Sequence, residues 1–302
     1  MPLEVTVPAS SANLGPGFDC LGLSVGITLH VRATPAPQDA FHYHGEGPVP
    51  EEPDNLIHQG FRAAFAACGR EAPTVRLDAD NPIPMARGLG SSSAALVAGA
   101  LLGDAACGGQ LGLDGVFQLT ADLEGHPDNV APALYGGLTV SARDDQVWMS
   151  RVLPWPPSWR LLFGVPAFQI PTEVARALLP TQVSRSEAVL TAGRVSLWPL
   201  AVLRDEPELL RFASRDVTHE PYRHGLLPGF KEAQAELRDR GAWAAYLSGA
   251  GPSLGVVCAA QHVVTCSEIL ASYAGEDGRV LAPPIGQGAR VSGRFDAAPA
   301  TP

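Results

Sequence analysis

The sequence predicts an α+β protein of two domains, and three observations lead to this prediction. The chain has 302 residues, 46% of them hydrophobic, which is enough for two ordinary domains with cores of their own. Strand and helix patterns are mixed, without the strict strand–helix–strand alternation of a parallel sheet. Three prolines lie between Trp148 and Pro157. We therefore expect a boundary near residue 155, with domains at residues 1–155 and 156–302.

Strands dominate the first part of the chain. Residues 4–7 alternate as a strand does, and a second strand follows, with His30 on one face and four apolar residues on the other: Val25, Ile27, Leu29 and Val31. Residues 8–19, PASSANLGPGFD, lie between them and are rich in Ser, Asn, Gly and Pro, so we expect a loop there. The remaining patterns predict a strand at 74–77 and helices at 61–68, 94–102 and 116–124.

The second part mixes one buried strand, several helices and a hairpin. The apolar run 160–165 predicts the strand. Thr172 is the expected N-cap of the first helix, and the hairpin joins strands 242–247 and 253–258. The helices are expected at 172–179, 186–203, 206–213 and 229–240.

Composition excludes several classes of function. The formal net charge is −10, whereas nucleic acids and acidic membranes are bound through basic surfaces. No apolar run is long enough to span a membrane, and residues 1–11 show no secretory signal, so we expect a cytoplasmic protein. The five cysteines have no CxxC spacing, which predicts reduced thiols and neither a disulfide framework nor a zinc site.

The most informative segment is PMARGLGSSSA, Pro84–Ala94, which leads into an apolar helix. Gly88 and Gly90 allow tight turns and a close approach of the backbone to a ligand. Three serines, 91–93, then supply hydroxyls and N-cap chemistry at the helix start. Free N–H groups and the positive end of the helix dipole favour a phosphate there. The segment indicates a nucleotide phosphate cradle, with an ordinary helix cap as the alternative.

Two common nucleotide loops do not fit this segment. A Walker A loop needs Lys and then Ser or Thr after its last glycine, and no lysine follows Gly90. A dinucleotide fingerprint needs a third glycine, and Ser93 stands in that place. Backbone amides and hydroxyls would therefore do more of the anion binding.

Three further segments are unusually polar or rich in small residues. Residues 10–19 carry Asn13 and Asp19, and residues 247–253 read LSGAGPS between two apolar strands. Residues 124–137, EGHPDNVAPALYGG, place four polar residues within six positions: Glu124, His126, Asp128 and Asn129. Taken singly, these segments also fit an Asx-turn, a tight hairpin and a solvated loop.

Together with the cradle, these segments resemble the signature motifs of the GHMP kinases, and among them most closely those of the homoserine kinase family. All four motifs stand in the family's order, and the resemblance covers the chain from about Val5 to Val291. The resemblance implies a ribosomal S5 domain 2-like ATP-binding domain, a ferredoxin-like C-terminal domain, and an active site in the cleft between them. It implies ATP-dependent phosphorylation of the side-chain hydroxyl of L-homoserine, a step of threonine biosynthesis.

The resemblance also implies which residues bind the nucleotide and which bind the metal. It implies that Asn55 contacts the adenine side, although a lone Asn more often caps a helix. For Mg²⁺ it implies a serine hydroxyl, Ser91 or Ser92, together with one carboxylate, for which Glu124 is favoured and Asp122 is the rival. The ATP phosphates would lie against the cradle residues Pro84, Met85, Ala86, Arg87, Gly88, Leu89, Gly90, Ser91, Ser92, Ser93 and Ala94.

At the amino-acid end, the resemblance implies that Arg176 and Arg223 bind the substrate carboxylate and Asp19 the ammonium group. Surface arginines are the plain alternative, although a guanidinium suits a carboxylate because it forms two parallel hydrogen bonds. The candidate catalytic residues are Asp128 and Asn129. Asp128 corresponds to a base in some relatives, while in others the γ-phosphate itself receives the proton. The pocket around the hydroxyl would be completed by Asn13, His126 and Asn129.

Two other functions share part of this pattern. Another GHMP kinase, of the mevalonate type or acting on a sugar, would have the cradle without the full set of remaining motifs. A non-catalytic ligand sensor would keep the fold but lose the metal carboxylate or the cradle serines, and this chain has both. The expected partner is a small molecule, and the resemblance also allows a homodimer.

Overall fold

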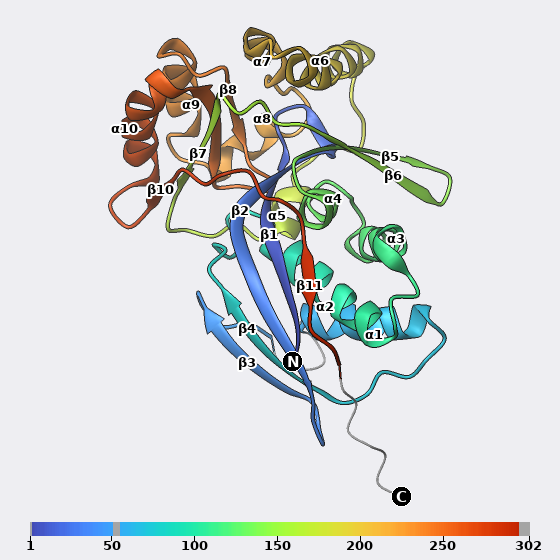
Figure 1. Ribbon diagram of the computed structural model, residues 1–302. Helices are drawn as coiled ribbons and strands as arrows, with labels where there is room; N and C mark the ends of the chain where they lie inside the picture. The colour runs from blue at the N-terminus through green and yellow to red at the C-terminus, as the bar shows by residue number, and fades with distance from the viewer. Residues whose placement is uncertain (1, 51–54, 296–302) are drawn as a thin grey trace, which may run out of the picture.

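A computed structural model describes residues 2–50 and 55–295 and contains two antiparallel-rich sheets (Figure 1). The larger sheet has the order β11-β1-β2-β4-β3, with β5 paired to β2 and β6 to β5. Among the described residues, the only parallel pair of strands in this sheet is β3 with β4. Its strands are β1 (Leu3–Asn13), β2 (Gly17–Pro35), β3 (Ala40–Gly45), β4 (Val75–Asn81), β5 (Leu138–Asp144), β6 (Val147–Leu153) and β11 (Arg290–Ser292).

Helices cover one face of this sheet (Figure 1). The face that β2 presents to them carries Val25, Leu29 and Val31, all fully buried, whereas Ile27, expected on the same face, is half-buried at a register shift. Helix α2 (Ser91–Ala106) is apolar all round and is buried along most of its length, as expected for a helix inside a core. The helices are α1 (Leu56–Ala67), α2 (Ser91–Ala106), α3 (Gly112–Glu124) and α4 (Val130–Tyr135).

The second sheet is fully antiparallel, with the order β10-β7-β9-β8. Its strands are β7 (Trp159–Val165), β8 (Ala244–Leu247), β9 (Leu254–Ala259) and β10 (Arg279–Leu281). Numbered from β7, this order is 4-1-3-2, and with helices after the first and third strands it is the ferredoxin-like arrangement expected from the resemblance. The α-helices are α5 (Thr172–Ala177), α6 (Arg185–Arg204), α7 (Leu210–Ala213), α8 (Glu220–Arg223), α9 (Phe230–Asp239) and α10 (Val263–Ala274), with 3₁₀ turns at Pro207–Leu209, His224–Leu226 and Ala260–His262.

The end of the chain returns to the first sheet. After β10, Ile285 forms a bridge with Val25, and β11 then pairs antiparallel with β1 through Val5 and Val291. In Figure 1 this red segment runs from the upper sheet down along β1. The two sheets are therefore tied together twice, by the chain between β6 and β7 and by this returning segment.

The largest correction concerns residues 8–19, which the sequence predicts as a loop. They belong to two long paired strands, with a short turn from Leu14 to Pro16. Register shifts at Pro8/Ala9 and Ala12/Asn13 accommodate the proline and the turn residues. The polar side chains are paired across the fold, because Ser11 Oγ lies 2.8 Å from Ser248 Oγ. Partners so distant in sequence cannot be inferred from local composition.

Several smaller expectations also change. Strand β3 was not predicted, because it is an edge strand whose His42 and His44 face solvent. Thr172 does not cap α5: the N-cap is Pro171, without a side-chain hydrogen bond. Residues 206–213 divide into a 3₁₀ turn and the short α7. Asn55 is the N-cap of α1, and its Oδ1 accepts the N–H groups of residues 57 and 58.

Two compositional expectations can be compared with the structure. All five cysteines are free thiols, as predicted, and Cys107, Cys258 and Cys266 are buried. Across residues 2–50 and 55–295, no helix combines the length and the apolar character needed to cross a membrane.

The contact between α1 and α2 predicts a sensitive glycine. A Cβ added at Gly99 would lie 1.9 Å from the carbonyl oxygen of Ile57. Gly99→Ala is therefore expected to lower the free energy of unfolding by about 1–3 kcal/mol, because the two backbones must separate. Gly193→Ala on α6 is the control, since its Cβ would meet no atom within 4 Å, and it should raise stability by roughly 0.5–1 kcal/mol. Urea denaturation measures both, and a neutral Gly99→Ala would contradict the packing argument.

Candidate active site

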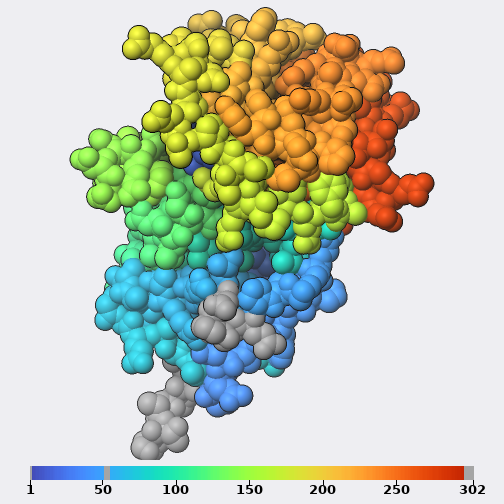
Figure 2. All heavy atoms as spheres, turned by 180° about the vertical axis from the view of Figure 1, so that it is seen from behind, coloured from blue at the N-terminus to red at the C-terminus, as the bar shows by residue number. Residues whose placement is uncertain are grey.

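A cavity of about 300 Å³ lies between the two sheets. Segments far apart in the sequence line it: the β1–β2 turn, the cradle, the α3–α4 loop, α5, α8 and the turn after β8. Figure 2 shows a recess on this face of the molecule, between the yellow-green segment above and the blue segments below, with teal atoms at its floor. Such a site between two sheets is the usual place for a small-molecule ligand.

The cradle has the backbone that its glycines predict. Gly88 and Gly90 have positive φ angles of 76° and 68°. A Cβ at Gly88 would lie 2.0 Å from the carbonyl oxygen of Ser248, and one at Gly90 would lie 2.1 Å from Ser10 Oγ. Both positions therefore require glycine, for conformation and for the close approach of neighbouring segments.

The cradle serines do not cap α2, which corrects the expected N-cap chemistry. The N-cap is Gly90, and no side chain bonds the first turn. Ser91 Oγ accepts a hydrogen bond from Asn81 Nδ2 at 3.0 Å, whereas Ser92 Oγ and Ser93 Oγ both donate to Glu124 Oε1, at 3.3 and 2.6 Å. The serines therefore connect the helix start to neighbouring polar groups, Glu124 among them.

The first N–H groups of α2 are left free. Ala94 N–H is the first to bond within the helix, to Gly90 O. Among the described residues, the N–H groups of Ser91, Ser92 and Ser93 have no acceptor, as at any uncapped helix start. Ser91 and Ser92 also line the cavity. A 16-residue helix thus directs its positive end toward the cavity, which is an anion-binding arrangement.

The LSGAGPS turn holds the cradle from the other sheet. Ser248 Oγ donates to Gly88 O at 2.5 Å, and Ser253 Oγ donates to Arg87 O at 2.6 Å. Gly249 N–H donates to Ala12 O at 3.1 Å. The turn therefore fixes both the cradle and the end of β1, which brings three of the four sequence motifs into contact.

Some predicted nucleotide residues do not line the cavity. The Arg87 side chain bonds Glu46 at 2.7 Å, the carbonyls of Pro166 and Ala167, and the cradle carbonyl of Met85 at 3.3 Å. Pro84, Ser93 and Ala94 are also absent from the lining, whereas Asn55 is part of it. Asp122 lies outside the cavity and accepts a hydrogen bond from Trp148 Nε1. The lining from the predicted cradle is Met85, Ala86, Gly88, Leu89, Gly90, Ser91 and Ser92.

Glu124, His126, Asp128 and Asn129 all line the cavity. Asn129 Oδ1 accepts from Ser10 Oγ at 2.9 Å, and His126 Nδ1 lies 2.8 Å from Asp128 Oδ1. Burial disfavours the charged form of His126, but the hydrogen bond and charge of Asp128 and the charge of Glu124 outweigh it, so the pKa of His126 is raised. The raised pKa favours the charged imidazolium of His126 in its pair with Asp128.

Two arginines reach the cavity from α5 and α8. Arg176 forms a bidentate ion pair with Asp19, at 2.6 and 3.2 Å. Arg223 is only 2% exposed and has no carboxylate within 4 Å among the described residues. Burial, and then the charge of Arg176, lower the pKa of Arg223 to about 10. Asn13 adds a buried Oδ1 with no hydrogen-bond partner in the described structure.

Asp19, His126 and Asp128 form a cluster in which one ligand atom of each lies within 4.8 Å of the others. Such a set could hold a cation, but Arg176 already neutralises Asp19, and His126 pairs with Asp128. Glu124, whose Oε1 accepts from two cradle serines, is the carboxylate next to the cradle. The geometry thus separates an oxygen-rich position at the cradle from a mixed-charge cluster in which His126 and Asp128 line the cavity and Asp19 does not.

Sequence reasoning missed Phe18. Its ring lies 5.0 Å from the guanidinium carbon of Arg176 and 5.6 Å from that of Arg223, so it contacts both cations. Its position next to Asp19, within a polar motif, was the only local signal. The contact itself depends on residues more than 150 positions away.

Comparisons with known proteins agree with this geometry. The models of the GHMP kinases N terminal domain and of the GHMP kinases C terminal match residues 55–137 and 201–268. The chain is 48% identical over 282 residues to a homoserine kinase of Thermus thermophilus, which covers 93% of this chain and 96% of that protein. This chain belongs to the homoserine kinase family of the GHMP kinases. A homoserine kinase of Moorella thermoacetica is 40% identical, over 91% of this chain and 93% of its own length.

Solved structures extend the comparison. The crystal structure of the homoserine kinase from Cytophaga hutchinsonii superposes with a TM-score of 0.85 at 25% identity, covering 96% of this chain and 97% of that one. A mevalonate diphosphate decarboxylase from Enterococcus faecalis shares the fold, with a TM-score of 0.71 at 16% identity over 96% and 99% of the two chains. Membership of the GHMP kinases implies that this protein uses ATP and acts on a small molecule.

The His126–Asp128 pair predicts a measurable titration. In the wild-type protein we expect His126 to titrate above 6.5, and Asp128→Asn should lower its pKa. Because the folded-state pKa is raised, the stability from this pair is fully present below pH 6.5 and is lost as the pH rises through the folded-state pKa. NMR titration of the imidazole resonances tests this, with the exposed His44 as internal reference. An unchanged His126 pKa in Asp128→Asn would exclude the pair as its cause.

Proposed function

We propose that the protein transfers the γ-phosphoryl group of ATP to the side-chain hydroxyl of L-homoserine. The observation that carries this proposal is the continuity of one cavity, from the free helix N-terminus at Ser91 to the buried cation of Arg223. The first end suits phosphates, and the second suits the carboxylate of an amino acid. The family's relatives named homoserine kinase support this choice of acceptor.

The residues at the cradle fit a nucleoside triphosphate. Gly88 and Gly90 let the cradle backbone pack against Ser248 and Ser10, and the free N–H groups at the start of α2 are donors for phosphate oxygens. Bound ATP supplies the phosphoryl group. Glu124 and Ser91 would hold its Mg²⁺, because Mg²⁺ favours a carboxylate and a few neutral oxygens beside phosphates and water. Asn55 lies in the same cavity and would contact the nucleoside end.

The other end fits a zwitterionic amino acid. Asp19 would accept the substrate ammonium group, and Arg223 and Arg176 would donate to the carboxylate. Because Asp19 and Arg176 form an ion pair with each other, substrate binding would exchange this pair for two ion pairs to the ligand. The unpartnered Asn13 Oδ1 supplies a further acceptor for a donor group of the substrate.

The proton of the substrate hydroxyl needs an acceptor as the phosphoryl group transfers. We propose Asp128, which lies at the cavity wall and whose carboxylate is oriented by His126. Asn129 is oriented by Ser10, which leaves its Nδ2 group to donate toward the reacting centre. Positioning and electrostatic support make up most of the catalysis in this class of reaction.

The proposal is tested by a coupled assay of ADP release. Homoserine, threonine, serine and mevalonate are compared at equal concentrations with ATP and Mg²⁺. We expect the highest kcat/KM for homoserine. Absence of homoserine-dependent ADP release would overturn the proposal, and a preference for mevalonate would instead support a different GHMP kinase activity.

The role of Asp128 has its own test. If Asp128 accepts the proton, Asp128→Asn should lower kcat by roughly 10²–10⁴-fold, the range typical of a general base. Its KM for ATP should stay close to the wild-type value, because among the described residues its carboxylate bonds His126 and no cradle residue. A fall of less than about tenfold would assign the proton to the γ-phosphate itself.

Glu124 and Asp122 form a matched pair for the metal assignment. Both are carboxylates at the end of α3, but only Glu124 lines the cavity. Glu124→Gln is expected to raise the Mg²⁺ concentration needed for half-maximal activity by roughly tenfold or more, since a charged ligand is replaced by a neutral one. Asp122→Asn should leave the Mg²⁺ titration unchanged. The opposite ranking would transfer the metal site to Asp122.

A further inference from the structure

We propose that His219 is a positioning residue for the carboxylate end of the substrate, because it holds Arg223 toward the cavity without neutralising its charge. The inference rests on the proposed function. Sequence reasoning selected Arg223 within HEPYRHGLLPGF and passed over His219, four residues earlier. His219 lies at the start of α8 and is completely buried.

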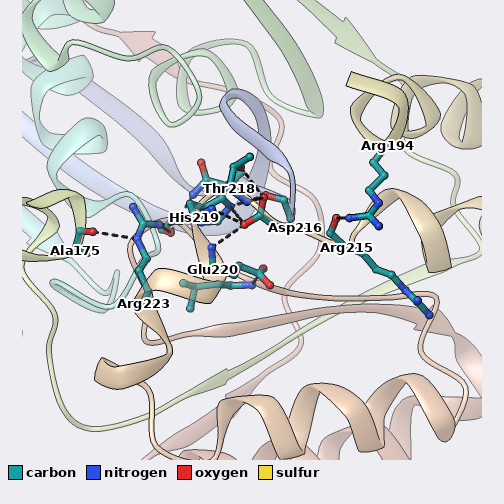
Figure 3. A network of polar contacts seen from close by, with 12 residues as sticks. Ala175, Arg194, Arg215, Asp216, Thr218, His219, Glu220 and Arg223 are labelled. Carbon is teal, nitrogen blue, oxygen red and sulfur yellow. Dashed lines mark hydrogen bonds and ion pairs between the residues drawn. The ribbon is translucent and has the colours of Figure 1, made fainter. Parts of the chain in front are cut away.

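Both ring nitrogens of His219 are used. Nε2 lies 2.6 Å from the carbonyl oxygen of Gly15, and Nδ1 lies 3.1 Å from Arg223 Nη1. A carbonyl can only accept and a guanidinium can only donate, so Nε2 carries the proton and Nδ1 is the acceptor. This assignment requires a neutral imidazole. Figure 3 shows the ring between Asp216 and Arg223.

The surroundings of His219 favour this neutral form. Burial lowers its pKa, and the charge of Arg223 lowers it further, against the opposing effects of Asp216 and Asp128. The Asp216 carboxylate is occupied by the backbone, since it accepts the N–H groups of Thr218, His219 and Glu220 at 2.7–2.9 Å. Asp216 therefore shapes the turn that orients the ring, as the dashed lines in Figure 3 show.

The neutral ring leaves Arg223 with an unmatched charge. Its other partners are also neutral: the carbonyl oxygens of Ala175, at 3.3 Å, and Gly249, at 3.1 Å. A buried cation held only by neutral acceptors retains its attraction for a ligand carboxylate. A carboxylate side chain in place of His219 would hold the guanidinium equally well but would compete with the substrate.

His219 also contacts residues of the β1–β2 turn and the start of β2. Its hydrogen bond to Gly15 fixes the turn that carries Asn13, and its ring lies 5.4 Å from the ring of Phe18. Phe18 in turn contacts both arginines. One imidazole therefore sets the distance between the cation of Arg223 and the β1–β2 turn.

The test compares His219→Leu, which removes both hydrogen bonds, with His219→Gln, which keeps one donor and one acceptor. For His219→Leu we expect KM for homoserine to rise about tenfold, the effect of losing one or two hydrogen bonds, with kcat and KM for ATP within about twofold of wild type. His219→Gln should fall between wild type and His219→Leu. His44→Gln, at an exposed position on β3, is the control and should change nothing.

A double-mutant cycle shows whether His219 acts through Arg223. In an Arg223→Ala background, His219→Leu should raise KM for homoserine by less than about twofold, because the residue it positions is gone. Additive effects of the two substitutions would overturn the inference, as would equal increases in KM for homoserine and ATP. If His219→Leu does not fold, the same cycle is run with His219→Gln. A wild-type enzyme without homoserine-dependent turnover would instead overturn the proposed function.

Discussion

The site depends on one packing constraint: the cradle, the end of β1 and the turn after β8 approach one another at backbone distance. Gly88 fits against the carbonyl of Ser248, and Gly90 fits against Ser10. Hydroxyls of Ser248 and Ser253 then bond the cradle carbonyls. These contacts join elements of both sheets. The free start of α2 and the arginines of α5 and α8 therefore face one cavity, although they belong to different parts of the fold.

The electrostatics of the cavity are local and run against the charge of the whole protein. The chain carries a formal charge of −10, so long-range attraction does not favour an anionic ligand. Under the proposed function, the attraction for anions would come from the free N–H groups of α2, the arginines and the Mg²⁺ that accompanies ATP. Asp19 balances Arg176, whereas Arg223 lacks such a partner among the described residues. An amino acid with one ammonium and one carboxylate group matches this distribution.

Sequence patterns predicted the elements with strong periodicity and the motifs with unusual composition. The strand from Val25 to Val31 follows from its alternating apolar residues, and the β8–β9 hairpin follows from two apolar segments around a turn of small residues. The cradle is recognisable because two glycines and three serines stand together immediately before an apolar helix. Local patterns could not show that Glu124 engages the cradle serines, or that the Arg87 side chain points to Glu46. Both contacts are made with partners about 30 to 40 residues away. For Ser92 and Ser93, the bond to Glu124 replaces the expected cap of α2.

The arrangement around Arg223 links stability to binding. Burying a guanidinium without a carboxylate is unfavourable, and an acidic partner would relieve this cost. The fold has an acid close by, Asp216, but uses both of its oxygens on the backbone of the turn that begins α8. A neutral histidine then contacts the arginine. The same residues that leave the cation without an ionic partner also fix where it points. A ligand carboxylate bound at that position would relieve the unfavourable burial of the cation.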